Sequence, residues 1–124
     1  ALLLNDPVLA VRHTAALTLA VLGDARAESA ARALAQDPAS EGLPQPHFVL
    51  GSAALRRGDL QAARRELLRA VALVPYHADA LVLLADGELR LGDAPQAREW
   101  LYEALRFNPQ HRGAHERLRL ARGG

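Results

Sequence analysis

The chain has 124 residues, enough for one domain, and its net charge of +1 is too small to indicate binding to nucleic acid or to a membrane surface. Alanine (26 residues) and leucine (24 residues) dominate, whereas cysteine, methionine, lysine and isoleucine are absent. The lack of cysteine excludes disulfides, cysteine-ligated metals and thiol catalysis. The many helix formers predict an all-α fold, and the use of arginine as the only cation besides histidine is typical of a GC-rich bacterial genome.

The first 43 residues repeat at an interval of 31. Asp6-Pro7 returns as Asp37-Pro38, and this dipeptide is typical of a helix start because the carboxylate caps the helix and proline fits its first turn. Apolar residues at helical spacing lie on both sides of Gly23-Asp24, which is a turn signal. We therefore expect residues 1–43 to form a helical hairpin. The same interval makes residues 1–5 the tail of a preceding repeat, so we expect the chain to be a fragment of a longer protein.

From residue 44 onwards the interval is 34, and it divides the chain into two consecutive units, 44–77 and 78–111. Self-similarity at a fixed period of this length is the signature of stacked structural repeats. The residues that recur at this offset are Gly58-Asp59 with Gly92-Asp93, Ala63 with Ala97, Ala70 with Ala104, Pro75 with Pro109, and His77 with His111.

Each 34-residue unit is predicted to be a helical hairpin. The glycine of the Gly-Asp pair can end the first helix in a left-handed conformation, the aspartate can cap the second helix, and the proline prevents that helix from continuing. The recurring alanines suit places where two helices approach closely. Residues 112–124 are predicted to form a capping helix and tail, with one charged face toward solvent and an apolar stripe made of Ala114, Leu118 and Ala121.

The pattern of residues 44–111 resembles the tetratricopeptide repeat (TPR), which combines an apolar–small pair (Leu50-Gly51 and Leu84-Ala85 here) with the Gly-Asp turn, the alanines and the closing proline. The resemblance implies a right-handed α-solenoid of stacked hairpins. The chain departs from the family where large aromatic residues are expected, and the residues found there are His47, Leu81, Ala54 and Glu88.

Residues 1–43 resemble a short HEAT-type repeat of the bacterial kind. A degenerate TPR is the alternative, because Gly23-Asp24 also fits the TPR turn. In either case the hairpin is expected to stack on the next one and to form one continuous domain with it.

The resemblance to TPR proteins also implies a concave groove that is lined by the first helix of each hairpin and holds a partner peptide or helix. The carboxylate clamp with which some TPR domains bind acidic chaperone tails is absent, so such tails are not expected as ligands. In the bland alternative, Leu55 and Leu89 belong to the core and the other residues are ordinary surface. The positions carried over to this groove are Phe48, Ser52, Leu55, Arg56, Val82, Asp86, Leu89 and Arg90.

The histidines were considered as metal ligands. His111 and His115 are four residues apart on an expected helix start, a spacing that can place two imidazoles on one metal ion, but Glu116 is the only further ligand nearby. Structural roles are therefore favoured and no metal is predicted. The sequence contains no phosphate-binding loop, nucleophile elbow or zinc-protease motif, so neither a cofactor nor enzyme activity is expected.

The sequence thus favours a protein–protein interaction scaffold with a protein or peptide partner and no nucleic-acid ligand. One alternative is a structural spacer or accessory tail of a larger bacterial protein, for example one with multihaem cytochrome domains. The other is self-association as a homo-oligomer through exposed repeat ends near residues 2–4. No apolar run approaches the roughly 18–20 residues of a membrane span, and no signal peptide is recognisable. The sequence does not distinguish the cytoplasm from the periplasm.

Overall fold

The computed structural model describes residues 11, 26–40 and 42–123. Within these residues the regular elements are all helical. The first part of the expected hairpin over 1–43, including the tail at 1–5, lies outside the described residues, so the choice between a HEAT-like repeat and a degenerate TPR stays open. The elements are α3 (Arg26–Gln36), the 3-10 turn η1 (Pro38–Ser40), α4 (Gln45–Arg57), α5 (Leu60–Leu73), α6 (Ala78–Arg90), α7 (Ala94–Phe107) and α8 (Arg112–Gly123).

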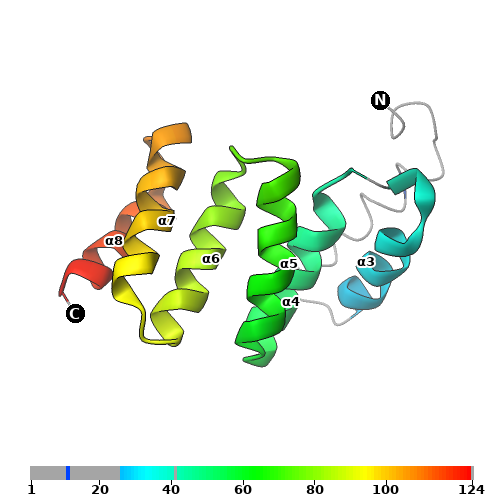
Figure 1. Ribbon diagram of the computed structural model, residues 1–124, viewed down its shortest axis with the longest axis horizontal. Coiled ribbons are helices and arrows are strands. Elements are labelled where there is room, and N and C mark those ends of the chain that lie inside the picture. The colour runs from blue at the N-terminus through cyan, green and yellow to red at the C-terminus, as the bar shows by residue number, and fades with distance from the viewer. Residues whose placement is uncertain (1–10, 12–25, 41, 124) are drawn as a thin grey trace.

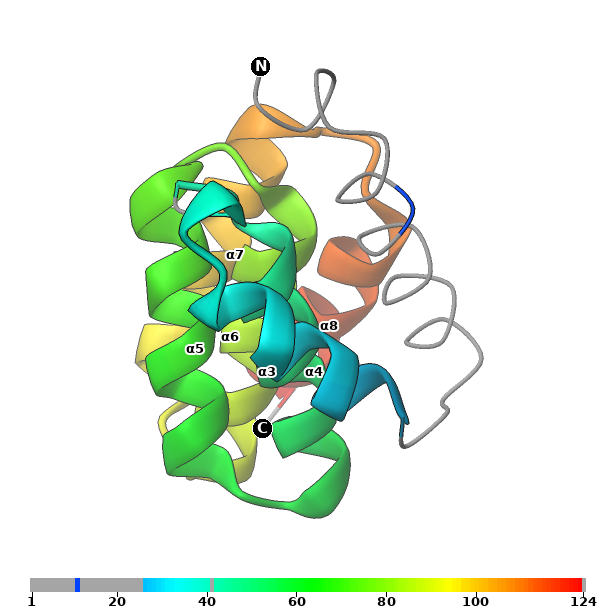
Figure 2. The ribbon, with the colours of Figure 1, turned by 90° about the vertical axis from the view of Figure 1, so that its right-hand side faces the viewer.

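The helices from α4 to α8 alternate in direction along a row, so α5 and α7 run the same way (Figure 1). Seen along the row, α5 and α7 lie on one side, and α4 and α8 lie on the other (Figure 2). α6 contacts both α4 and α8. We call the outward surface of α4, α6 and α8 the first-helix face, and that of α5 and α7 the second-helix face. The described part of the molecule is an α-solenoid, as the sequence predicts.

The turn inside each hairpin forms as the Gly-Asp pairs predict. Gly58 and Gly92 have φ angles of 82° and 85°, in the left-handed region that glycine adopts without steric cost. Asp59 accepts a hydrogen bond from the backbone N–H of Ala62 at 3.2 Å, and Asp93 caps α7 in the same way. These local contacts fix where the second helix of each hairpin begins.

The core runs continuously from α4 to α8 and is built largely from alanine and leucine. Small residues recur where helices cross, which confirms the prediction of close approaches, and a leucine fills the space between two alanines on each second helix. None of these side chains is more than 1% exposed: Ala63, Leu67, Ala70, Ala97, Leu101 and Ala104.

Glu88 is the exception in this apolar layer. Only 3% of its side chain is exposed, and its carboxylate Oε1 lies 3.3 Å from Nε of Arg64 on α5. A buried carboxylate requires such a partner because desolvation of an unpaired charge is costly. At a position where the family carries a large aromatic residue, this chain therefore places an ion pair between the two hairpins.

Helix α8 packs on α7 and α6 through the predicted stripe. Ala114, Leu118 and Ala121 are 0%, 7% and 2% exposed, respectively, and Arg98 of α7 donates a hydrogen bond to the carbonyl of Ala121 at 3.2 Å. The positions at which α6 receives α7 differ in α8. Leu81, Ala85 and Glu88 are buried on α6, whereas the residues 34 positions later are exposed and polar: His115, Arg119 and Arg122.

Candidate functional site

The predicted groove residues lie on α4 and α6, two neighbouring helices of the first-helix face that contact each other. Each position on α4 has its counterpart on α6 at the repeat offset of 34 residues, so the two sets form parallel rows. Figure 2 shows that this face lies opposite α5 and α7. The rows are Phe48, Ser52, Leu55 and Arg56 on α4, and Val82, Asp86, Leu89 and Arg90 on α6.

Two of these residues offer almost no surface to a ligand. Leu55 and Val82 are each 4% exposed and belong to the main core cluster. Leu55 is directed at α6, where its Cδ2 would lie 3.7 Å from a Cβ atom added to Gly87. Both side chains support the groove from below.

Two charged groove residues are tied to other parts of the solenoid. Arg117 of α8 donates a hydrogen bond from Nε to Oδ1 of Asp86 at 2.5 Å, and this bond raises the pKa of the Arg117 guanidinium above its ordinary value, with burial acting in the opposite direction. Arg90 donates from Nη1 to the carbonyl oxygen of Leu55 at 2.7 Å. These contacts link α4, α6 and α8 across the first-helix face.

The remaining groove residues are accessible to different degrees. Phe48, Ser52 and Leu89 are partly buried, and Arg56 is exposed. The Phe48 ring stacks on the imidazole of His77, with ring centroids 4.9 Å apart and an interplanar angle of 27°. Apolar side chains that are only partly covered are suited to contact a partner's apolar side chains.

The structure adds residues on α8 that the sequence reasoning did not include. The repeat offset places Glu116 and Leu120 at the positions of Val82 and Asp86. Leu120 is 69% exposed, and Glu116 is also exposed. Applying the interval of 34 once more, to the predicted capping helix, is the signal that would have found them.

The histidines that recur between the hairpins act as helix caps. Nδ1 of His77 accepts the N–H of Ala80, and Nδ1 of His111 accepts the N–H of Ala114, each at 3.1 Å. Nε2 of His111 lies 2.7 Å from the Asp79 carboxylate. Both nitrogens of this imidazole therefore have partners, and since Nδ1 accepts, Nε2 carries the proton.

His115, the other half of the considered metal pair, is also engaged. Its Nε2 lies 2.8 Å from the carbonyl oxygen of Pro109. The part of the chain that the structure describes contains no group of three or more ligand side chains suited to a metal ion.

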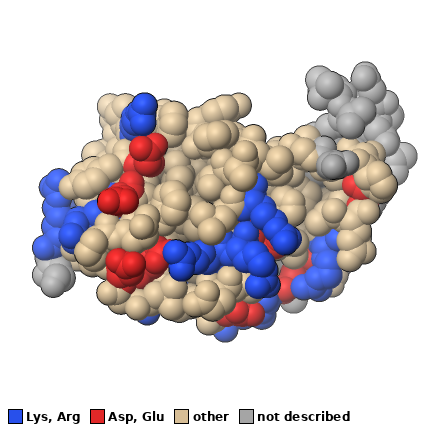
Figure 3. Space-filling view, in the orientation of Figure 1, with Lys and Arg blue, Asp and Glu red and all other residues tan. Residues whose placement is uncertain are grey.

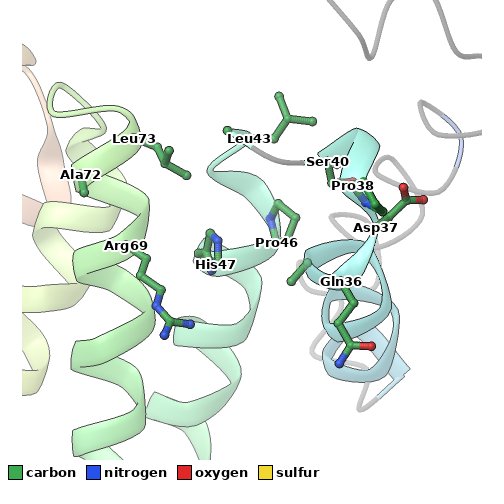
Figure 4. A pocket seen from close by; sticks show the side chains of 12 residues that line it. Gln36, Asp37, Pro38, Ser40, Leu43, Pro46, His47, Arg69, Ala72 and Leu73 are labelled. Atoms are coloured by element: carbon green, nitrogen blue, oxygen red, sulfur yellow. The ribbon is translucent and has the colours of Figure 1, made fainter.

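The largest pocket lies apart from the predicted groove residues. It has a volume of about 570 Å³ and lies between the end of α3, η1, the start of α4 and the end of α5 (Figure 4). Its lining is mostly apolar, with His47 and Arg69 among the polar residues. Nδ1 of His47 lies 3.4 Å from Oε1 of Glu66, and Arg69 pairs with the same carboxylate oxygen at 3.0 Å. The polar groups on this wall therefore already face one another.

Comparison with known proteins gives a consistent result. A family model described as tetratricopeptide repeat matches residues 48–112. The crystal structure of MamA is similar, with a TM-score of 0.77 and 25% identity, covering 98% of this chain and 71% of that one. An O-GlcNAc transferase variant from Thermobaculum terrenum is similar with a TM-score of 0.78 and 28% identity, over 91% of this chain.

This chain spans only 22% of the length of the transferase chain. No curated protein matches it in sequence. Among the described helices, none has the length and apolar character needed to cross a membrane. TPR repeats generally mediate protein–protein interactions and are typically non-catalytic. The family model covers more than half of the chain, and the chain belongs to the tetratricopeptide repeat family.

Proposed function

We propose that the chain is a non-catalytic protein–protein interaction scaffold that binds a peptide or helix of a partner protein on its first-helix face. The observation that carries the proposal is the exposure of Leu120, a leucine that is 69% accessible on the third first-helix of the stack. With the partly buried Phe48 and Leu89, it gives each of the three helices one accessible apolar side chain. Such a row suits a peptide with spaced apolar anchors.

The polar groups between these apolar positions favour a role in orientation over one in chemistry. Asp86 is engaged by Arg117, and Arg90 is engaged by the Leu55 carbonyl. A partner therefore meets a surface whose charges are already fixed by the fold. The preorganised groups add specificity at a low entropic cost.

Selection of peptides from a displayed random library provides ligands with which the proposal can be tested. The dissociation constants of selected peptides are then measured by fluorescence anisotropy for the wild type, Leu89→Glu and Leu120→Glu. A carboxylate in an apolar contact costs binding energy because it is desolvated without a partner, so we expect at least about a tenfold loss in each variant.

The matched control is Leu68→Glu on the second-helix face, where Leu68 is 38% exposed. This variant should bind the selected peptides with unchanged affinity, and circular dichroism should show the same helix content for all proteins. Unchanged affinity in both groove variants, or a loss in the Leu68 variant alone, would refute the proposal.

A second candidate function is favoured by the transferase comparison, in which a segment similar to this chain makes up 22% of a larger protein. In that case the solenoid is an accessory part of a multidomain protein. The sequence of the complete gene would distinguish this arrangement, because a catalytic domain encoded in the same reading frame is expected only there.

A further inference from the structure

The second-helix face carries opposite charges at equivalent positions of its two helices. Arg65 of α5 and Glu99 of α7 are 34 residues apart and both exposed, and among the contacts of the described residues neither has an ion-pair or hydrogen-bond partner. One turn further along, Arg69 and Glu103 repeat the reversal. Figure 3 shows basic side chains gathered over α5 and acidic ones over α7.

The exposed apolar residues of this face also occur in equivalent pairs. Leu68 is 38% exposed and Tyr102, its counterpart on α7, is 47% exposed. Leu73 and its counterpart Phe107 are 41% and 43% exposed. Each helix therefore combines accessible apolar side chains with charges whose sign is opposite to that of the other helix.

This arrangement is complementary to itself under two-fold symmetry. Because α5 and α7 are parallel (Figure 1), a two-fold axis that runs alongside and midway between them brings α5 of one copy opposite α7 of the other, with equivalent positions at the same height. Each such contact recurs twice in an isologous interface. The facing pairs are Gln61 with Pro95, Arg65 with Glu99, Leu68 with Tyr102, Arg69 with Glu103, Ala72 with Arg106, and Leu73 with Phe107.

No pair in this set brings like charges together. The equivalent residues that share a sign, Arg64 and Arg98, are engaged within the molecule. Arg64 pairs with the buried Glu88 at 3.3 Å, and Arg98 donates to the Ala121 carbonyl at 3.2 Å. The existing pairs of Arg69 with Glu66 and of Arg106 with Glu103 are exposed contacts within one helix, which contribute little and exchange partners easily.

We propose that the second-helix face binds a second copy of this chain in an isologous dimer, with α5 of each copy against α7 of the other. This contact is separate from the first-helix face and from the repeat ends considered in the sequence analysis. Each helix has 14 residues, a length of about 21 Å, so the interface is at the small end of specific interfaces. The dimer is therefore weak, with a dissociation constant on the order of 100 μM, and sensitive to salt because the charge pairs lie near solvent.

Sedimentation velocity of the full chain over a concentration series up to about 1 mM, in low and high salt, measures this association. Arg65→Glu places two carboxylates opposite each other at each site, and Glu99→Arg places two guanidiniums there. Each variant alone should dimerise at least about tenfold more weakly than the wild type.

Mixing the two variants gives the sharper test. In the mixed dimer both sites again pair opposite charges, so the mixture should associate about as tightly as the wild type. This gain cannot arise from misfolding, which would only remove association. Arg119→Glu on α8 is the matched control, since Arg119 is exposed outside the face, and it should dimerise like the wild type.

Three results would overturn the proposal. The first is a wild type that remains monomeric at the highest concentration, which would leave the face to a different partner. The second is a mixture that associates no more tightly than its components. The third is a loss of association in Arg119→Glu equal to that in Arg65→Glu, which would place the contact at the end of the stack.

Discussion

Arg117 of α8 and Asp86 of α6 form a hydrogen-bonded ion pair of 2.5 Å that joins two successive first helices. Their side chains are 29% and 21% exposed, so the pair is partly shielded from water. Asp86 was predicted as a partner-binding residue, and it also holds the last helix in place. A substitution of Asp86 therefore changes the stability of the solenoid as well as its surface.

Asp86→Arg should lower the free energy of unfolding by about 2 kcal/mol, because it replaces an attraction to Arg117 with a repulsion in a partly shielded site. Asp86→Asn should cost about 1 kcal/mol, since the amide oxygen can still accept the hydrogen bond. The reciprocal double variant Asp86→Arg, Arg117→Asp should recover most of the loss. Urea unfolding followed by circular dichroism measures all three, and a double variant no more stable than Asp86→Arg would show that the pair does not couple.

The pH dependence of this contribution follows from Arg117. Its pKa in the folded state is raised by the bond to Asp86 above the ordinary value of 12.5. A raised pKa stabilises the fold at every pH below the unfolded-state value and is lost only as the pH rises through the folded-state value. The difference in stability between the wild type and Arg117→Ala should therefore be the same at about pH 7 and pH 10.

The buried pair of Glu88 and Arg64 predicts an asymmetric response. Arg64→Ala leaves a carboxylate in the core without a partner and should cost about 2 kcal/mol, because the desolvated charge is no longer compensated. Glu88→Leu removes the buried charge and leaves Arg64, which is 46% exposed, free to be hydrated. It should lie within about 1 kcal/mol of the wild type. Thermal unfolding distinguishes the two, and equal losses would mean that the buried charge is not the source of the penalty.

Two glycines within first helices give a matched steric test. A Cβ atom on Gly51 would lie 2.6 Å from Cγ of Leu67, which is 1% exposed and cannot move aside, whereas one on Gly87 would meet its nearest neighbour at 3.7 Å. Gly51→Ala should destabilise the fold by about 1–3 kcal/mol. Gly87→Ala should stabilise it by about 0.5 kcal/mol, since alanine favours the helix. Chemical denaturation of both variants checks the signs, and a loss of stability in Gly87→Ala comparable with that in Gly51→Ala would contradict this account.

The histidine cap of α6 can be isolated by comparing two substitutions. His77→Ala and His77→Asn both remove the stack on Phe48, but only asparagine retains an acceptor for the Ala80 N–H. His77→Ala should therefore be less stable than His77→Asn by about 1 kcal/mol, the usual value of an N-cap. If the two variants unfold at the same denaturant concentration, the imidazole does not act as a cap.

The sequence predicted the features of this fold that depend on neighbouring residues. The ends of α4 and the starts of α5 and α7 follow from Gly58, Asp59 and Asp93, whose conformations and caps act within a few residues. The repeat interval then predicted which alanines meet at helix crossings. Both kinds of information are local or periodic, so they can be read from one sequence.

Contacts between hairpins could not be predicted in this way. The bonds from Arg117 to Asp86 and from Arg90 to the Leu55 carbonyl span 31 and 35 residues, and they depend on the angle at which successive helices cross. The burial of Leu55 and Val82 has the same origin, because the neighbouring helix decides how much of each side chain remains exposed. Leu120 could have been found from the repeat interval, but its exposure follows only from the packing of α8.

The central claim is that a partner binds on the first-helix face, and methyl NMR of the chain with a selected peptide tests it most directly. Leu89 and Leu120 provide reporters on this face, and Leu68 and Leu73 provide reporters on the second-helix face; single substitutions assign their signals. Addition of peptide should shift the methyl signals of Leu89 and Leu120 and leave those of Leu68 and Leu73 unchanged. Shifts confined to Leu68 and Leu73 would contradict the account.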